Sequence, residues 1–339
     1  MNDRYSRQEV FYGVGKEGQK KLLKSKVAII GAGALGTVTA NLLVRAGVGF
    51  VRIVDRDYVE LSNLQRQVIY DEEDARNAVP KAEAACRHLR QVNSEIDIEP
   101  VINDFNSSTA DSIIRDVDLV MDATDSLSTR FLINEACRHH KKTWIYGGAV
   151  GSAGMTANYI YGDDEPCMCC LMRPEMDDGN GATCTSAGVL GSATNIVASI
   201  QCSEAIKYLT GNSEAMRRTM LSFDLWKNLF EEFPLFKDPN CPVCAKGEYT
   251  FYGKAGGMQA ISLCGRNSVQ IVPVHVREID FPEFAARLEK VGKVSFNSFT
   301  LDFDNGDFQI KLFKNGRALI KNVDDVNRSK SIYSEYIGL

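Results

Sequence analysis

The stretch Val27-Ala28-Ile29-Ile30-Gly31-Ala32-Gly33-Ala34-Leu35-Gly36 decides the predicted fold. Its first four residues form a short apolar run that predicts a strand, and residues 35–46 follow with helical spacing. Gly31, Gly33 and Gly36 fit the pattern G-x-G-x-x-G at the junction. Glycines let backbone N–H groups approach a phosphate or a ribose closely, and the N-terminus of a helix favours negative charge. The stretch therefore predicts a nucleotide-binding turn between a strand and a helix.

Strands and helices alternate through the residues that follow this turn. We expect strands at 51–55 and 117–122, helices at 81–93 and 129–140, and a continuation of the sheet within 143–161. A further buried helix is expected at 188–209. Alternating strands and helices indicate βαβ units. The predicted fold class is α/β, with a Rossmann-like, mainly parallel sheet that has helices on both faces.

The C-terminal part of the chain has a different pattern. Residues 247–257 contain four glycines and are predicted to be a linker between a first domain, 1–246, and a second domain, 258–339. In the second domain, Asp304-Asn305-Gly306-Asp307 and Lys314-Asn315-Gly316 separate runs of alternating hydrophobicity, which is a strong signal for hairpins. Helices are expected at 281–291 and 326–337. We therefore predict a small α+β C-terminal domain.

Composition excludes several classes of protein. The 339 residues carry a net charge of −5, which argues against a nucleic-acid partner, since such proteins usually have a basic face. No apolar run reaches the ~18 residues of a membrane span, so no membrane association is expected. The N-terminus lacks an apolar signal core, and we expect a cytoplasmic protein.

Polar side chains follow the second predicted strand. Asp55 lies 19 residues after Gly36, at the position where a carboxylate accepts hydrogen bonds from ribose hydroxyls. Taken alone, this pair of features fits an NAD or FAD site. The donors that follow, above all Asn63 and Arg66, suit a triphosphate better, because several groups must hold it and arginine grips two oxygens at once. The candidate ligand-binding residues are Gly31, Gly33, Gly36, Asp55, Asp57, Asn63, Arg66, Gln67, Lys81 and Asp125.

Two of these candidates also have simpler interpretations. Lys81, at a helix start after Pro80, can neutralise outer phosphates, but a lysine there is most often a solvated helix residue. Asp125 follows a strand and can hold Mg²⁺, which prefers carboxylates and phosphate oxygens. Asp125 also suits the N-cap of the next helix.

Two C-x-x-C pairs, Cys167/Cys170 and Cys241/Cys244, can together close a tetrahedral zinc site. The separation between the pairs exceeds that of a zinc ribbon, and Cys169 lies within the first pair, so the choice of Cys167 over Cys169 rests on the two-residue gap. A redox C-x-x-C and buried unliganded thiols are the alternatives. Four cysteine ligands leave no position for water, which indicates a structural role.

The residues Arg4-Tyr5-Ser6-Arg7-Gln8, the glycine loop, the run from Asp55 to Gln67, Lys81, Asp125 and the two cysteine pairs resemble the ThiF/MoeB/HesA adenylyltransferases. These are bacterial relatives of the ubiquitin-activating enzymes. The resemblance covers residues 1–246 in order, and the C-terminal part is similar to a small domain attached to some ThiF-like proteins. It favours a zinc site at the cysteines.

The resemblance implies adenylylation, by Mg·ATP, of the C-terminal Gly-Gly carboxylate of a ubiquitin-like sulfur-carrier protein, for thiamine or molybdopterin synthesis. It assigns the adenosine to Gly33 and Asp55, the phosphates to Asn63, Arg66 and Lys81, and Mg²⁺ to Asp125. A homodimer is implied, with Arg7 supplied across its interface, as is a sulfur donor such as a cysteine desulfurase. Cys184 resembles a cysteine that accepts the activated acyl group or a persulfide in some relatives. The segment after Asp125 departs from the family, with Ser126-Leu127 where relatives often have Asn-Phe.

Three other functions compete with this interpretation. One is adenylylation of another carboxylate, on a peptide or a tRNA-linked amino acid, by the same fold. The others are an NAD-dependent oxidoreductase and a non-catalytic nucleotide-binding scaffold. Arg66, Lys81 and Asp125 argue against these last two, because neither needs a triphosphate site with a metal-binding carboxylate.

Overall fold

The computed structural model describes residues 3–174, 187–253, 259–263, 268–273, 279–323 and 325–338. The chain divides into two units, Met1–Lys254 and Ala255–Leu339. The predicted linker, 247–257, spans the boundary between them, and its last four residues lie outside the described residues. Each unit has its own sheet.

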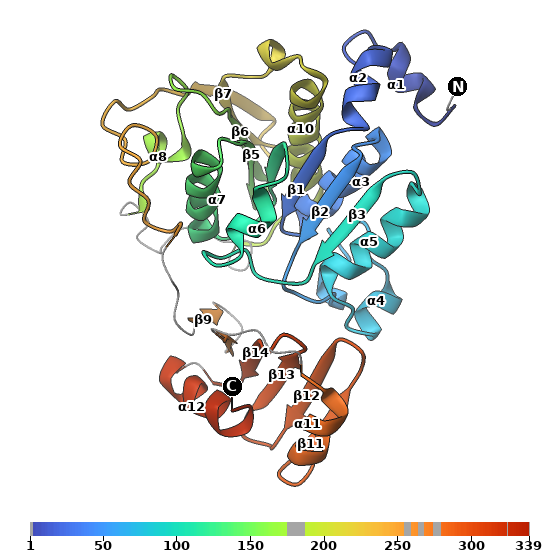
Figure 1. Ribbon diagram of the computed structural model, residues 1–339, viewed down its shortest axis with the longest axis vertical. Helices are drawn as coiled ribbons and strands as arrows, with labels where there is room; N and C mark the ends of the chain where they lie inside the picture. The colour runs from blue at the N-terminus through green and yellow to red at the C-terminus, as the bar shows by residue number, and fades with distance from the viewer. Residues whose placement is uncertain are drawn as a thin grey trace. The chain divides into compact units, whose positions relative to one another are not determined.

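The first unit is built on an eight-stranded sheet with the order β3-β2-β1-β4-β5-β6-β7-β8 (Figure 1). Pairing is parallel from β3 to β5 and antiparallel from β5 to β8. The predicted α/β class, with a mainly parallel sheet, is confirmed. The strands are β1 (Lys26–Ile30), β2 (Phe50–Val54), β3 (Asp97–Val101), β4 (Leu119–Asp122), β5 (Thr143–Val150), β6 (Ala153–Tyr159), β7 (Thr219–Asp224) and β8 (Leu229–Pro234).

Helices cover both faces of this sheet, as the sequence predicts. On one face, α3 (Ala34–Ala46) contacts both α5 (Lys81–Val92) and α10 (Gly191–Thr210). On the other face, α6 (Ala110–Ile114) contacts α7 (Leu127–His139). Because both faces of β1 are covered, its last four residues are all buried, which explains the continuous apolar run in the sequence.

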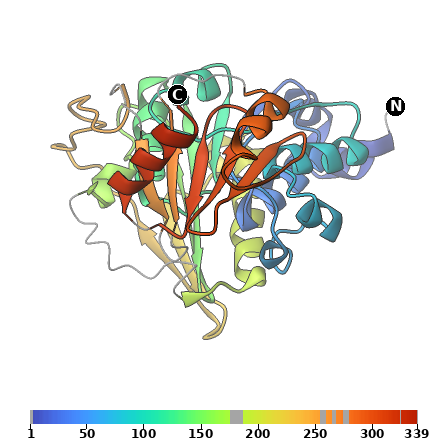
Figure 2. The same ribbon diagram turned by 90° about the horizontal axis from the view of Figure 1, so that it is seen from below.

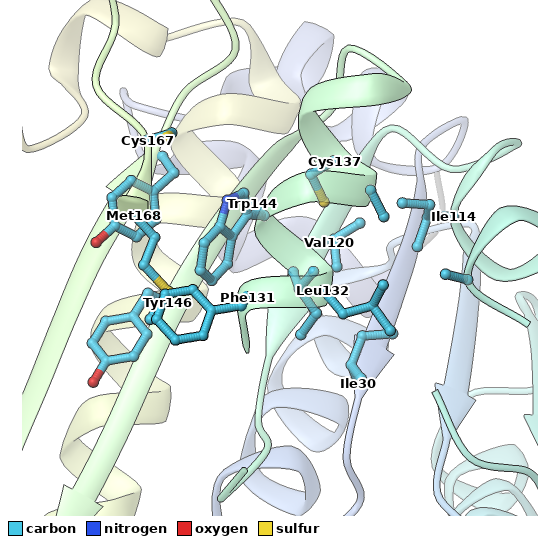
Figure 3. Packing of buried hydrophobic residues seen from close by; sticks show 14 of the residues in the cluster. Ile30, Ile114, Val120, Phe131, Leu132, Cys137, Trp144, Tyr146, Cys167 and Met168 are labelled. Atoms are coloured by element: carbon cyan, nitrogen blue, oxygen red, sulfur yellow. The ribbon is translucent and has the colours of Figure 1, made fainter. Parts of the chain in front are cut away.

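The core beneath α6 and α7 is a single hydrophobic cluster. Figure 3 shows Phe131, Leu132 and Cys137 of α7 packed against the strands, with Trp144 and Tyr146 of β5 beside them. Cys167 and Met168 close one end of the cluster, so the first cysteine pair is anchored directly on the core.

The remaining helices in the described part of the first unit are short. They are η1 (Asp3–Tyr5), α1 (Ser6–Val10), α2 (Gly15–Leu22), η2 (Leu61–Asn63), α4 (Glu72–Arg76), α8 (Met168–Leu171) and η4 (Ser213–Ala215). None of the helices in the described part of the chain is long and apolar enough to cross a membrane.

In its described residues, the second unit is an antiparallel sheet with the order β11-β12-β13-β14-β10-β9 and two helices on one face (Figures 1 and 2). Both predicted hairpins are confirmed: β12 and β13 join through 305–308, and β13 and β14 through 314–317. Gly306 and Gly316 have positive φ in these turns. The elements are β9 (Gln259–Leu263), β10 (Ser268–Val272), α11 (Phe281–Leu288), β11 (Lys293–Phe296), β12 (Thr300–Asp304), β13 (Gln309–Phe313), β14 (Ala318–Lys321) and α12 (Val326–Tyr336).

Candidate active site

The glycine loop lies between β1 and α3, at the carboxyl edge of the parallel strands. Gly31 has φ +103°, and a Cβ atom there would lie 2.5 Å from the carbonyl oxygen of Ala123. A Cβ atom at Gly36 would overlap the carbonyl oxygen of Gly31. At Gly33, by contrast, the nearest group to a Cβ position is the Nε2 atom of Gln67, at 4.0 Å. Gly31 and Gly36 thus let the loop pack closely, whereas Gly33 leaves open space for a ligand.

The N-terminus of α3 faces the same loop. Its N-cap residue is Gly33, which offers no side-chain hydrogen bond. The first N–H groups of a helix have no partner within the helix, so they are available to a phosphate, whose charge the helix dipole also favours.

Asp55 follows β2 and ties the glycine loop to the next segment. Its Oδ2 atom accepts a hydrogen bond from the Ala32 N–H at 2.7 Å, and its Oδ1 atom accepts one from the Asp57 N–H at 2.7 Å. Burial raises the pKa of Asp55, and the positive charge of Lys81 lowers it by less, so the pKa is raised overall. Since a carboxylate has about four acceptor sites, two remain for ribose hydroxyls.

Lys81 is a buried cation, and the simpler interpretation of it as a solvated helix residue is wrong. It begins α5, is 7% exposed, and its Nζ atom lies 3.5 Å from Asp57 Oδ2. Burial lowers the pKa of Lys81, but Asp57, Asp55 and Asp125 outweigh burial and raise it. The Tyr70 hydroxyl donates to the carbonyl of Ala32 or of Lys81, at 2.7 and 3.1 Å, and so links the glycine loop to α5. The lysine is therefore held charged beside the loop.

Asn63, Arg66 and Gln67 lie in and after η2, beside the loop. The Asn63 Oδ1 atom accepts a hydrogen bond from the Glu60 N–H, and Arg66 donates to the carbonyl of Ser62. Gln67 is buried, and no described residue donates a hydrogen bond to its Oε1 atom. A buried polar atom without a partner, next to the open space at Gly33, is what a site for a polar ligand presents. These residues therefore fit a bound nucleotide.

Asp125 follows β4 and is exposed. The alternative interpretation of Asp125 as a helix N-cap is wrong, because Ser126 is the N-cap of α7 and its hydroxyl accepts from the Thr129 N–H at 3.3 Å. The Asp125 carboxylate contributes to the raised pKa of Lys81, which places the two groups in one electrostatic environment. Asp125 thus remains available as a ligand to a metal ion.

The sequence analysis missed a buried ion pair beside this carboxylate. Arg130 donates from Nε to Asp122 Oδ2 at 3.1 Å, and Asp122 is fully buried. The guanidinium also lies 5.0 Å from the centroid of the Tyr146 ring. Two opposite charges eight residues apart are an ordinary pattern, so only the burial of β4 gives the pair its significance.

Arg7 lies far from the nucleotide loop of its own chain. It is exposed on α1, and Tyr5, two residues earlier, packs against Gly47 at the C-terminal end of α3. The loop is at the other end of this helix, whose 13 residues span about 20 Å. Figure 1 shows α1 and α2 together at one end of the first unit. Arg7 therefore does not reach the site within this chain.

The four predicted cysteine ligands come together. The sulfurs of Cys167, Cys170, Cys241 and Cys244 all lie within 4.8 Å of one another. Two of these separations join the two pairs, 3.6 Å for Cys167–Cys241 and 3.4 Å for Cys170–Cys244. Tetrahedral zinc with Zn–S bonds of ~2.3 Å separates its sulfurs by about 3.8 Å. The cluster therefore fits a Cys₄ zinc ion.

Cys169 is a neighbour of Cys167, but its sulfur is not one of the four sulfurs that all lie within 4.8 Å of one another. Its sulfur accepts a hydrogen bond from Asn134 Nδ2 at 3.5 Å, on the side of α7. The choice of Cys167 over Cys169, made from the two-residue gap, is consistent with this placement. Cys184 lies outside the described residues.

The segment after the second cysteine pair is held on α7 by one carboxylate. Glu135 is buried and accepts hydrogen bonds from the N–H groups of Thr250, Phe251 and Tyr252, at 2.9, 2.6 and 2.8 Å. The ring of Phe251 stacks on that of Phe131, with centroids 5.7 Å apart. The end of the first unit is thus fixed independently of the cysteines.

A glycine loop at the first β–α turn of a doubly wound sheet, with a buried lysine and carboxylates around it, defines a nucleotide-binding α/β protein. The ThiF family model matches residues 5–243, and the chain belongs to the ThiF family. It is 42% identical to "Sulfur carrier protein ThiS adenylyltransferase" of Bacillus subtilis (strain 168), over 100% of both chains. It is 35% identical to "Molybdopterin-synthase adenylyltransferase" of Escherichia coli (strain K12), over 72% of this chain and 96% of the relative.

A crystal structure of Escherichia coli MccB with ATP has the same fold. The TM-score is 0.64 and the identity 23%, over 72% of this chain and 74% of that one. The resemblance that the sequence predicts is therefore confirmed at the level of family and fold.

Proposed function

We propose that the protein adenylylates the C-terminal Gly-Gly carboxylate of a ubiquitin-like sulfur-carrier protein, in thiamine or molybdopterin synthesis. The observation that carries the proposal is the gathering of the glycine loop, Lys81 and Asp125 at one edge of the sheet, in a chain similar throughout its length to a ThiS adenylyltransferase. A buried, charged lysine beside open space suits a triphosphate. An NAD-dependent oxidoreductase has no need of it.

In the proposed reaction, a carboxylate oxygen of the carrier attacks the α-phosphorus of ATP. The bond from that phosphorus to the oxygen bridging to the β-phosphate breaks, and the products are an acyl-adenylate and pyrophosphate. The attacking carboxylate is already ionised, so no base is required. Catalysis then rests on positioning and on stabilising charge.

Each residue of the site has a role in this proposal. Gly31 and Gly36 shape the loop, Gly33 and Asp55 hold the adenosine, and Asp57 keeps Lys81 charged. The phosphates are held by Asn63, Arg66, Gln67 and Lys81. Asp125 would bind Mg²⁺, which neutralises phosphate charge when bound. Cys167, Cys170, Cys241 and Cys244 would hold a structural zinc ion.

We also propose a homodimer in which Arg7 completes the partner's site. Arg7 is too far from its own loop, and Val10, Phe11 and Tyr12 beside it are 80%, 53% and 95% exposed. A run of exposed apolar residues is typical of an interface, and closed two-fold association completes both sites alike. Cys184 is proposed as the thiol used after adenylylation. Its thiolate attacks the acyl-adenylate, the acyl–phosphate bond breaks, and the products are a thioester and AMP; alternatively, it receives persulfide sulfur from a donor such as a cysteine desulfurase. A thiolate is a natural acceptor for an activated acyl group.

Mass spectrometry of the product tests the proposed reaction. The protein is incubated with Mg·ATP and purified small proteins that end in Gly-Gly, and the adduct of AMP on the carrier is sought. The matched control is the same carrier without its last glycine. We expect the adduct only on the intact carrier. An adduct on neither carrier, with AMP transferred to a free peptide or amino acid instead, would favour the alternative of another carboxylate.

A further inference from the structure

The Asp125 carboxylate interacts electrostatically with Lys81 and Arg130, without a hydrogen bond or an ion pair to either. Within the described ranges, no hydrogen bond or ion pair fixes its carboxylate, which is exposed at the carboxyl end of β4. A metal ligand must nevertheless be presented in a defined position. The position of Asp125 therefore depends on the backbone on either side of it.

The preceding residue, Thr124, is fixed through both of its backbone groups. Its N–H donates to Asp122 Oδ1 at 2.9 Å, and its carbonyl accepts from Arg130 Nη2 at 2.8 Å. The same guanidinium donates to Asp122 Oδ2 and, at 3.1 Å, to the carbonyl of Gly147 on β5. Asp122 and Arg130 thus enclose the Thr124 backbone from two sides.

The β4 end of this arrangement is also fixed. Gln201 of α10 donates from Nε2 to the carbonyls of Asp122 and Ile145, at 2.9 and 3.1 Å. The pairing between β4 and β5 stops at Met121 and Ile145, one residue before Asp122. Arg130 and Gln201 therefore bridge β4 and β5 where the strands cease to pair, immediately before Asp125.

We propose that Arg130 is a positioning residue that, through Thr124, presents the Asp125 carboxylate to the Mg²⁺ of bound Mg·ATP. The inference rests on the proposed function. Arginine suits the role because its planar fork donates in several fixed directions at once, which a lysine ammonium does not. The alternative is a buried ion pair that only stabilises the fold.

The test measures nucleotide binding, without turnover. Calorimetry gives the affinity for α,β-methylene-ATP at saturating Mg²⁺ and with no Mg²⁺ added, and the ratio of the two affinities reports what the metal contributes. Partners that orient a metal ligand are typically worth roughly 10–100-fold in affinity. We expect Arg130→Lys to lower the ratio about tenfold and to change the affinity without Mg²⁺ less than twofold.

A second substitution decides whether Arg130 acts through Asp125. In an Asp125→Asn background, Arg130→Lys should lower the ratio no further, because coupled residues are non-additive. Arg52→Lys is the matched control: like Arg130, Arg52 makes ion pairs below the surface, with Glu99 and Asp116, but it does not contact the Asp125 segment. It should lower the melting temperature and leave the ratio at the wild-type value.

Each outcome has one meaning. The positioning role is overturned if Arg130→Lys keeps the wild-type ratio of affinities. It is also overturned if Arg130→Lys lowers that ratio as much in the Asp125→Asn background as in the wild type. Neither result affects the proposed metal-binding role of Asp125. A wild-type ratio of affinities in Asp125→Asn shows that Asp125 does not bind the metal ion. That result removes this role from the proposed function and also refutes the inference about Arg130. If Arg130→Lys does not fold, Asp122→Asn tests the same proposal, because it weakens the ion pair that holds the guanidinium. A wild-type ratio of affinities in Asp122→Asn also contradicts the proposal.

Discussion

Replacing Cys241 by serine should remove the metal from the first unit and loosen the segment around the second cysteine pair. Cys241 is fully buried, and its sulfur lies 3.6 Å from that of Cys167. A structural zinc ion contributes on the order of 10 kcal/mol to folding. Losing about half of that contribution already exceeds the ~4 kcal/mol that marks an exceptional single substitution.

The matched control for this substitution is Cys169→Ser. Cys169 is equally buried and lies two residues after Cys167, but its sulfur accepts a hydrogen bond from Asn134 and is not one of the four sulfurs that all lie within 4.8 Å of one another. It should keep one zinc ion per chain and lose about 1 kcal/mol, the typical cost of a point substitution.

The assays are metal analysis, urea unfolding and hydrogen exchange. In Cys241→Ser, fast exchange should appear in residues 238–248. Residues 250–252 should keep more protection, because Glu135 holds their N–H groups independently of the cysteines. An unchanged zinc content in Cys241→Ser, or equal destabilisation by both substitutions, would refute the assignment of the cluster as a zinc site.

Three further predictions concern the interface, the thiol and pH. The variants Arg7→Ala and Lys81→Ala should each be inactive alone. If Arg7 acts across the interface, their mixed dimers should regain one intact site and about a quarter to a half of the activity. No recovery of activity despite proven subunit exchange contradicts a role of Arg7 in the partner's site. Cys184→Ala should leave ATP–pyrophosphate exchange nearly intact but impair sulfur transfer to the carrier, and loss of both or of neither counts against an acceptor thiol. Burial lowers the pKa of His140 below 6.5, with His139 and Lys142 acting in the same direction and Asp111 opposing them. Because the unfolded chain then takes up the proton first, stability should fall as pH drops below 6.5, and urea unfolding at pH 7.5 and 5.5 should show a smaller fall in His140→Gln.

The helices and strands with a clear hydrophobic periodicity could be predicted from the sequence. The strands at the two edges of the first sheet could not. The strand at β1, the helices α3, α5 and α7, and both hairpins of the second unit follow from hydrophobic spacing and turn residues. β3 was missed because it is an edge strand with Pro100 inside it, a residue that cannot donate to a ladder. β8 was missed because all six of its residues are exposed, so no face alternates.

In the site, residue types could be predicted, but their environments could not. The glycine pattern and the cysteine spacing each depend on a few positions close in sequence. The burial of Lys81 depends on Asp57 and Tyr70, and the role of Arg130 depends on carbonyls from β5. Contacts between separate elements leave no periodic signal, so the sequence identifies the candidates and the fold assigns their partners.

The most direct test of the account is ATP–pyrophosphate exchange with a purified Gly-Gly carrier, measured for the wild type, Lys81→Met and Lys21→Met. Lys21 is the control because it bonds the carbonyl of Thr210, at the end of α10 away from the site. We expect exchange that requires the carrier, a loss of about 10²–10³-fold in Lys81→Met, by analogy with a lost transition-state donor, and a wild-type rate in Lys21→Met. Exchange that is independent of the carrier, or unchanged in Lys81→Met, would contradict the account.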